Sequence, residues 1–314
     1  MQLVDYTAQM AKQWNELVAA AKNGHFMFNR SYMDYHADRF TDASVVVLDE
    51  VGNPMALLPA NVRDGVLYSH QGLSFGGLVM SHKIKASEVL SIFDELAGFL
   101  KAKGITKVMY KPVPVIYHRQ PAQEDLYVMF RLNAKLYRVD LSTTIDLNSP
   151  GKFSNGKRTG LNRAEREGVE VHESSDFARF FEIAQHRMQE KYATSPVHTE
   201  AEMTRLHKDF PGNIRLFGGY VNGIMEAGCV VYVSDKVCHA QYIASTNIGR
   251  ETRAVDAVIG TLVQQTFKDK TFFDFGNSNE EQGRVLNSNL CAQKEEFGGR
   301  GTVQMFYEWD ISHG

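Results

Sequence analysis

An internal repeat constrains the fold of this chain more than any other feature of the sequence. The segment at 137–142, Tyr-Arg-Val-Asp-Leu-Ser, returns at 307–312 as Tyr-Glu-Trp-Asp-Ile-Ser. The order of predicted elements before each copy is also the same: a strand, helices, strands joined by tight turns, a helix and a last strand. The helix beginning at Ala86, for example, corresponds to one beginning at Ala254. A repeat this long indicates a duplicated domain rather than a solenoid unit, and two such domains side by side would enclose a cleft.

Length and composition agree with two globular domains. A chain of 314 residues accommodates one domain at 1–148 and a second at 149–314, with a linker around the Pro-Gly pair at 150–151. The net charge of −3 provides no general attraction to nucleic acid or to anionic membranes. No signal peptide and no apolar run long enough for a membrane span are recognisable, so we expect a cytoplasmic protein. The three cysteines have no metal-binding or disulfide spacing and are expected to be buried and reduced.

The pattern within each half predicts an α/β fold with mixed sheets. In the second half, strands are predicted at 214–220, 224–233 and 236–244, and the turns between them indicate antiparallel hairpins. A helix and a strand at 271–275 follow, which is the order of a parallel crossover. This is the layout of the GNAT acyltransferase fold, in which two adjacent parallel strands part and accept an acyl donor in the gap.

The loop before the crossover helix, at 245–253, is the predicted donor site. Free N–H groups at the start of a helix can bind phosphate, and the loop contains the candidates Ser245, Gly249, Arg250 and Arg253. However, the loop lacks the Q/R-x-x-G-x-G/A pattern of GNAT enzymes that use acetyl-CoA, and it contains an acidic Glu251. We therefore expect acetyl-CoA to bind weakly or not at all. The alternative interpretation is a polar loop whose arginines are only solvated.

The segments that follow resemble a known family. The run Phe-Phe-Asp-Phe-Gly-Asn-Ser at 272–278 and the run Gln-Lys-Glu-Glu-Phe-Gly-Gly at 293–299 are similar to the C-terminal signature of the Fem-type (FemABX-like) nonribosomal peptidyltransferases. The resemblance extends to 242–245 and to a basic helix at 157–167 followed by Gly-Val at 168–169. Members of that peptidoglycan-related family consist of two GNAT domains in tandem. The resemblance therefore implies two tandem GNAT-like domains with an interdomain cleft.

The resemblance also implies roles for particular residues. The lysine before the Phe-Gly-Gly turn, Lys294, would lie in the donor channel and stabilise charge on the acyl carbonyl. Apart from the resemblance, Asp274 ends a predicted strand where the two parallel strands part, and it could orient the attacking amine or accept its proton. The remaining donor-side candidates are Tyr242, Phe297 and Gly298. The acceptor-side candidates are Lys157, Arg158, Arg163, Arg187 and Tyr192.

Each of these residues also has a purely structural interpretation. Lys294 could be an exposed lysine that complements a helix C-terminus, in which case its removal would cost only ~0.3 to 1 kcal/mol. Asp274 could cap the following turn. The basic helix could be a solvated surface, particularly because Glu165 and Glu167 dilute its charge.

The sequence thus predicts an acyl or aminoacyl transferase. The acyl donor would be either an aminoacyl-tRNA or an acyl-CoA, and the acceptor would be a small-molecule or peptide-linked amine bound between the domains. No metal and no enzyme nucleophile are implied. Two alternatives are a CoA-dependent N-acetyltransferase with a degenerate phosphate loop, and a ligand-binding module of the same fold without turnover.

Overall fold

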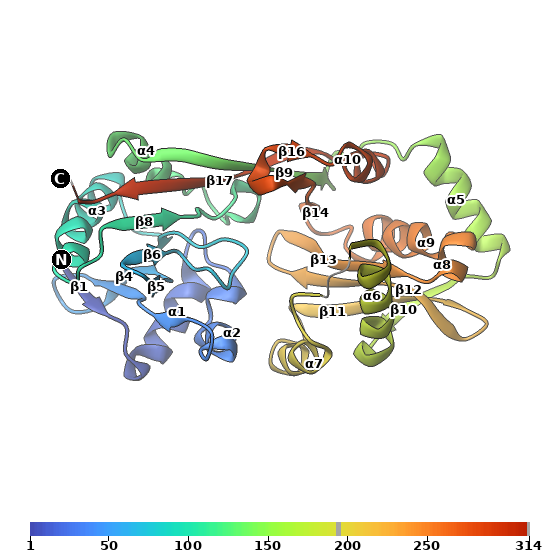
Figure 1. Ribbon diagram of the computed structural model, residues 1–314, viewed down its shortest axis with the longest axis horizontal. Coiled ribbons are helices and arrows are strands. Elements are labelled where there is room, and N and C mark those ends of the chain that lie inside the picture. Colours follow the sequence, from blue (N-terminus) through green and yellow to red (C-terminus); the bar gives the residue numbers. More distant parts are fainter. Residues whose placement is uncertain (193–195, 313–314) are drawn as a thin grey trace. The chain divides into compact units, whose positions relative to one another are not determined.

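The structure is a computed structural model that describes residues 1–192, without the side chains of 191 and 192, and residues 196–312. The chain divides into two compact units (Figure 1). Unit 1 consists of Met1–Asp140, Glu281–Arg284 and Val303–Gly314, and unit 2 consists of Leu141–Glu280 and Val285–Thr302. Both units combine helices with mixed sheets, which confirms the predicted α/β class.

Unit 1 contains two groups of paired strands. The first group has the order β1 (Gln2–Asp5), β3 (Val45–Leu48), β4 (Pro54–Leu58) and β7 (Val79–Met80). The second has the order β17 (Arg300–Asp310), β8 (Lys107–Tyr110), β6 (Val66–Tyr68), β5 (Asn61–Arg63) and β2 (Thr41–Asp42). The helices of unit 1 are α1 (Ala11–Ala20), α2 (Arg30–Met33), α3 (Ala86–Lys101) and α4 (Glu124–Arg131). Helix α3 lies in the crossover that links the parallel strands β6 and β8, and its helically spaced Val89, Phe93 and Leu96 are buried.

The strands of unit 2 form one mixed arrangement. Their order is β10 (Glu170–Ser174), β11 (Ile214–Val221), β12 (Ile224–Val233), β13 (Val237–Ser245), β14 (Phe272–Asn277) and the end of β9 (Lys135–Asp146). Among these neighbours, β13 and β14 are parallel and the other pairs are antiparallel. The helices of unit 2 are α5 (Asn155–Arg166), α6 (Phe177–Tyr192), α7 (Glu200–Asp209), α8 (Asn247–Glu251), α9 (Ala254–Thr261) and α10 (Ser288–Glu295). A short hairpin joins β15 (Asn279–Glu280) to β16 (Val285–Leu286).

The two faces of the unit 2 sheet are covered by different helices. Cys238 and Ala240 of β13 share a core with Phe273 of β14 and with the apolar side of α9. The opposite face lies against α6 (Figure 1). There Phe180 occupies the space beside Gly228. Because neighbouring side chains on a strand alternate between faces, the residues between the core positions of β13 and β14 point toward the α6 side.

The compact units differ from the two sequence halves by an exchange of strands. In unit 2, the end of β9 pairs with β14, so that Ile145 lies opposite Phe273. In unit 1, β17 pairs with β8, so that Tyr307 lies opposite Tyr110. The repeated segments at 137–142 and 307–312 belong to these two exchanged strands. The predicted boundary between residues 148 and 149 therefore falls inside unit 2, and it stays a prediction.

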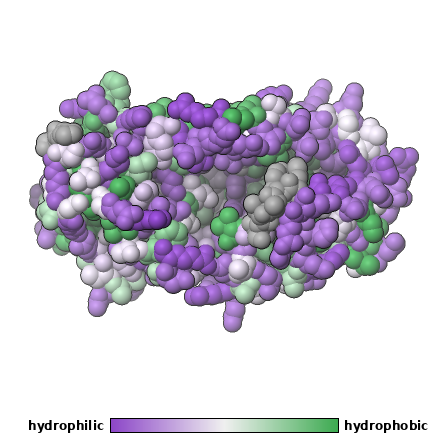
Figure 2. Space-filling model, viewed as in Figure 1, coloured by the Kyte–Doolittle hydropathy of each residue, from purple (hydrophilic) through white to green (hydrophobic). Residues whose placement is uncertain are grey.

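The surface and the cysteines are those of a globular protein. On the face shown in Figure 2, hydrophilic residues predominate and hydrophobic residues are scattered among them.

Within residues 1–192 and 196–312, none of the helices combines the length and hydrophobicity needed to span a bilayer. Cys229, Cys238 and Cys291 are free and buried, which confirms their predicted packing role.

Candidate active site

The parallel strands β13 and β14 part after three pairs of residues. Val237 lies opposite Phe272, Cys238 opposite Phe273 and, last, His239 opposite Asp274. Both strands continue beyond this point without pairing to each other. The ladder between β12 and β13 also shifts register next to the opening, between Val230 and Val231 of β12. Such bulges often lie beside active sites, where they redirect side chains.

Asp274 lies at this opening, and hydrogen bonds hold both of its carboxylate oxygens. Its Oδ1 accepts from Ser142 Oγ at 2.6 Å, from Thr144 Oγ1 at 3.0 Å and from Gly276 N at 3.2 Å. Its Oδ2 faces His239 Nδ1 at 2.8 Å. Burial by itself would raise the pKa of Asp274, but the hydrogen bond and charge of His239, together with the bonds from Ser142 and Gly276, lower this pKa to about 2. The carboxylate is therefore ionised at neutral pH.

His239 belongs to the site but was not predicted from the sequence. Its imidazole is 21% exposed, and its Nε2 has no hydrogen bond to any residue that the structure describes. The partner carboxylate is far away in sequence, and the two side chains meet only because β13 and β14 are parallel in this register. The sequence contains one signal for this pair. If the two predicted parallel strands had been aligned through the corresponding strands of the first half, His239 could have been placed opposite Asp274.

Lys294 lies near Asp274, but it is not the exposed helix-end residue considered above. It belongs to the last turn of α10 and is only 9% exposed. Its Nζ donates to Gly276 O at 2.9 Å and to Asn277 O at 2.6 Å, both at the end of β14. Burial lowers the pKa of Lys294 to about 8, although the charge of Asp274 acts in the opposite direction. An ammonium group has three hydrogens, and these two bonds use two of them.

The predicted phosphate loop has internal partners for its polar groups. Thr246 caps α8, and its Oγ1 accepts from Gly249 N at 3.0 Å. Arg250 donates to the side chain of Asn247, and Arg253 pairs with Asp256 at 2.8 Å. The loop thus folds as a capped turn of helix, which agrees with the polar-loop alternative rather than with a free phosphate cradle.

A cavity of about 400 Å³ brings three of the predicted residues together. Ser245, Arg250 and Arg187 line it between α6 and α8. Arg187 pairs with Glu190 at 2.7 Å, and Glu226 contributes a further carboxylate to the lining. The cavity therefore contains both signs of charge, which does not favour a polyphosphate.

The remaining donor-side candidates are mostly part of the core of unit 2. Tyr242 Oη lies 2.7 Å from His198 Nδ1. The ring of Phe297 stacks on Phe275. Gly298 has a φ of +88° and lies so close to the backbone of Gly151 that a side chain at this position would clash with it. A cavity of about 290 Å³ adjoins this turn and is lined by residues that include Gly298, Thr144 and Arg300.

The basic helix α5 separates into buried and exposed members. Lys157 is buried, and its Nζ pairs with Asp256 Oδ1 at 2.8 Å. Arg158 donates to Asn155 on the surface, and Arg163 pairs with Glu167 at 3.6 Å. Of the three predicted acceptor residues on this helix, the two arginines are thus the exposed ones. The side chain of Tyr192 lies outside the described residues.

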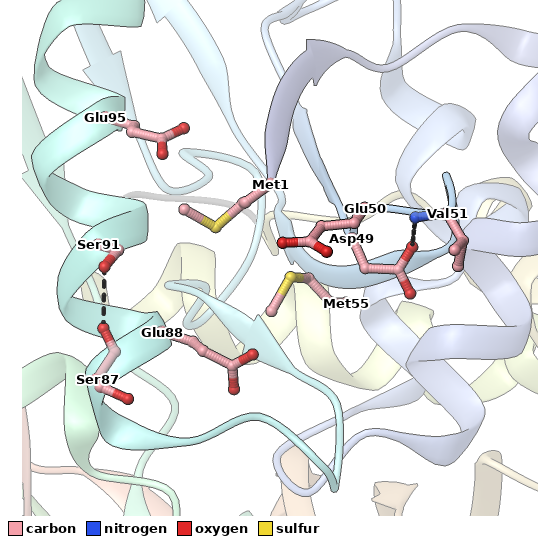
Figure 3. Close-up of a pocket in the computed structure, with 9 residues that line it drawn as sticks. All are labelled: Met1, Asp49, Glu50, Val51, Met55, Ser87, Glu88, Ser91 and Glu95. Carbon is pink, nitrogen blue, oxygen red and sulfur yellow. Dashed lines mark hydrogen bonds between the residues drawn. The ribbon is translucent and has the colours of Figure 1, made fainter.

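A further hollow of about 630 Å³ lies in unit 1 (Figure 3). Its lining is Met1, Asp49, Glu50, Val51, Met55, Ser87, Glu88, Ser91 and Glu95. Two of these carboxylates have structural tasks: Asp49 Oδ1 accepts from Val51 N in its own turn, and Glu88 accepts from Lys85 N at the start of α3. Two of the acidic side chains of this hollow are therefore explained by local structure, since one stabilises a turn and the other caps a helix.

Comparison with known proteins identifies the fold. Residues 151–282 match the family described as the acetyltransferase (GNAT) domain. No curated protein matches the chain in sequence. FemX has a TM-score of 0.72 at 11% identity, covering 99% of this chain and 98% of FemX. L-PGS from Bacillus licheniformis has a TM-score of 0.63 at 12% identity, covering 99% of this chain and 94% of L-PGS. A tandem GNAT protein from the clavulanic acid biosynthesis pathway has a TM-score of 0.52 at 11% identity, covering 100% of this chain and 99% of that protein.

The chain therefore has the Fem-type, tandem GNAT-like fold that the sequence resemblance implied. The family match covers β10 to β14 and thus includes the opened strand pair of unit 2. This match supports a transferase of acyl groups in general terms.

The buried carboxylate gives a prediction about stability. The pKa of Asp274 in the folded state, about 2, lies below its ordinary value of 3.8, so the carboxylate stabilises the fold above about pH 4 and this contribution is lost as the pH falls toward 2. A difference of nearly two pKa units corresponds to about 2 kcal/mol. We expect the free energy of unfolding, measured in urea, to fall between pH 4 and pH 2 in both wild type and Asp274→Asn. The fall should be about 2 kcal/mol larger in the wild type. Equal acid sensitivity of the two proteins would show that Asp274 is not held as described.

Proposed function

We propose that this protein transfers an activated acyl or aminoacyl group to an amine, and that the transfer takes place where β13 and β14 part in unit 2. The observation that carries the proposal is the coincidence of this opening with a buried ammonium group, that of Lys294. In the proposed reaction the amine attacks the carbonyl carbon of the donor and negative charge develops on the carbonyl oxygen. The third hydrogen of the Lys294 ammonium would stabilise this charge in a site of low exposure, where electrostatic interactions are strong.

The contacts of Lys294 support a fixed position for this charge. Two backbone carbonyls hold the Nζ atom, and both belong to the end of β14. A preorganised donor of this kind loses no energy to reorganisation when the oxyanion forms. A lysine that only complemented a helix terminus would be solvated instead.

The proposed donor is an aminoacyl ester of tRNA rather than acyl-CoA. The N–H group of Gly249 and the side chains of Arg250 and Arg253 are engaged within the protein. A CoA pyrophosphate would have to displace these contacts and approach Glu226 in the lining of the same cavity. The acceptor is proposed to reach the exposed Arg158 and Arg163 through a carboxylate or phosphate group, which suits arginine.

Acetyl-CoA provides a direct prediction. We expect isothermal titration calorimetry to detect no binding, or only weak binding, of acetyl-CoA to the purified protein. Tight binding would contradict this expectation and would favour the CoA-dependent N-acetyltransferase alternative. Binding of aminoacyl-tRNA should weaken steeply with increasing salt, because phosphate contacts release counterions.

The proposed function is tested with labelled donors. Total tRNA charged with a mixture of radiolabelled amino acids, and separately labelled acetyl-CoA, are each incubated with the protein and with amine acceptors that carry carboxylate or phosphate groups. The proposal predicts label in an amide product, with aminoacyl-tRNA as the active donor. If no protein-dependent product forms with either donor, the chain is better described as a binding module.

A further inference from the structure

The proposed reaction requires a group that accepts the proton of the attacking amine. We infer that His239, oriented by Asp274, is this general base. The inference rests on the proposed function and assigns a catalytic role to a residue that the sequence did not single out. Asp274 is then a positioning residue, because its own oxygens are occupied by hydrogen bonds.

The first support is the position of the pair. His239 and Asp274 form the last register pair before β13 and β14 part. Their neighbours Cys238 and Phe273 belong to the core under α9, so the imidazole and the carboxylate point to the other face of the sheet. The base thus lies at the point where the strands separate and not in the packed core.

The second support is the tautomer of the imidazole. The carboxylate of Asp274 is ionised and can only accept hydrogen bonds, and Ser142, Thr144 and Gly276 already donate to its other oxygen. The 2.8 Å contact between His239 Nδ1 and Asp274 Oδ2 therefore requires a hydrogen on Nδ1. In neutral imidazole this leaves the lone pair on Nε2, which is the arrangement of a general base.

The third support is the open space beside Nε2. Gly276 has a φ of +72° and lies against the ring. A Cβ atom built on Gly276 would lie 3.1 Å from His239 Cε1 and 3.8 Å from Nε2, and outside the segment 275–277 no other described residue comes within 4 Å of it. The same glycine receives the Lys294 ammonium on its carbonyl oxygen. Lys294 and His239 therefore both lie next to Gly276. At this opening the donor carbonyl could contact the ammonium while the attacking amine contacts the imidazole.

The fourth support comes from the duplicated fold. In unit 1, the corresponding parallel strands β6 and β8 also have three register pairs, and the last is Tyr68 opposite Met109. The fold therefore forms this junction without a histidine and a carboxylate. Since the architecture does not require the dyad, its presence in unit 2 indicates a chemical role.

The transfer step balances with these groups alone. The amine nitrogen forms a bond to the donor carbonyl carbon, and its proton passes to His239 Nε2. The bond between the carbonyl carbon and the ester oxygen of the donor then breaks, and the imidazolium returns the proton to that leaving oxygen. The products are the amide and a free hydroxyl at the end of the donor, with no oxidant, metal or covalent enzyme intermediate.

The experiment is chemical rescue of a histidine variant. His239→Ala is expected to lower turnover by a factor on the order of 100 to 10,000, as the loss of a general base does in other enzymes. Added imidazole should restore turnover with saturation, whereas a residue with a structural role would not respond in this way. Asp274→Asn should also lose turnover while the Michaelis constant for the donor changes little. The control is His172→Ala; His172 is an exposed residue of the edge strand β10 and stacks on Tyr220, with β11 and β12 between β10 and the opening.

The outcomes separate this inference from the proposed function. If wild type transfers the label and His239→Ala remains within a factor of about three of it, the inference is wrong while the proposed function stands. A strong loss that imidazole does not relieve, in a variant whose thermal unfolding matches wild type, also contradicts the inference. If His239→Ala fails to fold, His239→Gln gives the same test of turnover. If wild type transfers nothing from either donor, the proposed function fails and the inference fails with it.

Discussion

Replacing Lys294 by methionine is expected to lower turnover by a factor on the order of 100 to 1000. This is the loss that follows removal of one oxyanion donor in other enzymes. Methionine retains most of the aliphatic chain and removes the charge, so packing around α10 changes little. The turnover of wild type and Lys294→Met is compared in the labelled transfer assay at saturating donor. If the variant retains full activity, Lys294 has a structural role and the catalytic assignment is wrong.

The structure also changes the expectation for stability of this variant. The carbonyls of Gly276 and Asn277 lose the Lys294 ammonium, and the loss of a hydrogen bond to a charged group costs about 1.5–3 kcal/mol. Turnover must therefore be measured well below the unfolding temperature of the variant, as determined by circular dichroism. Lys294→Arg provides the matched control, because it retains a cation near both carbonyls.

The pH dependence distinguishes the ammonium from a neutral amine. The pKa of Lys294 is about 8, so the charged form is lost as the pH rises through that value. If the ammonium is the active form, turnover should decline above about pH 8 in wild type. The decline should be absent in Lys294→Arg, since arginine remains charged. A wild-type turnover that rises above pH 8 would contradict the oxyanion role.

The second large effect concerns stability, and it involves Lys157. Lys157→Met is expected to lower the free energy of unfolding by about 2 kcal/mol, because the buried Asp256 loses a charged hydrogen-bond partner and keeps the more exposed Arg253. Asp256 belongs to α9, is 4% exposed and pairs with Lys157 of α5. Urea unfolding followed by circular dichroism measures the effect.

Two further variants identify the cause. Arg158→Ala, on the exposed side of the same helix, should stay within about 0.5 kcal/mol of wild type. The double variant Lys157→Met with Asp256→Leu should recover much of the loss, because buried pairs can be replaced by apolar residues at little cost. If Lys157→Met is as stable as wild type and instead weakens acceptor binding, the role expected from the family resemblance is the correct one.

The architecture was predictable because the repeat and the hydrophobic patterns are local properties of the sequence. The crossover helix beginning at Ala86 and its counterpart beginning at Ala254 were both predicted at these positions. The exchange of β9 and β17 was not predictable in this way. The two strands share the repeated segment, so either one could pair with the last parallel strand of either unit, and only tertiary packing selects the partner.

The site was predictable only in part for a similar reason. Lys294 and Asp274 lie in segments that resemble a family signature, so the sequence identified them. His239 lies in an ordinary strand, and its importance depends on the parallel register that places it opposite Asp274. The burial of Lys157 depends on its partner Asp256 in another helix, and the charge pattern of α5 contains no information about that partner.

The central claim is that the acyl donor binds where β13 and β14 part, and nuclear magnetic resonance tests it most directly. Deuterated, nitrogen-15-labelled protein is titrated with amide-linked analogues of aminoacyl-adenosine, which resemble the end of aminoacyl-tRNA but cannot transfer their acyl group. The account predicts that the largest backbone shifts occur at residues 239–242 and 274–277, with little change at the corresponding pair Tyr68 and Met109 of unit 1. Shifts confined to unit 1 or to α8, or no shift at either of the two strand ends, would contradict it.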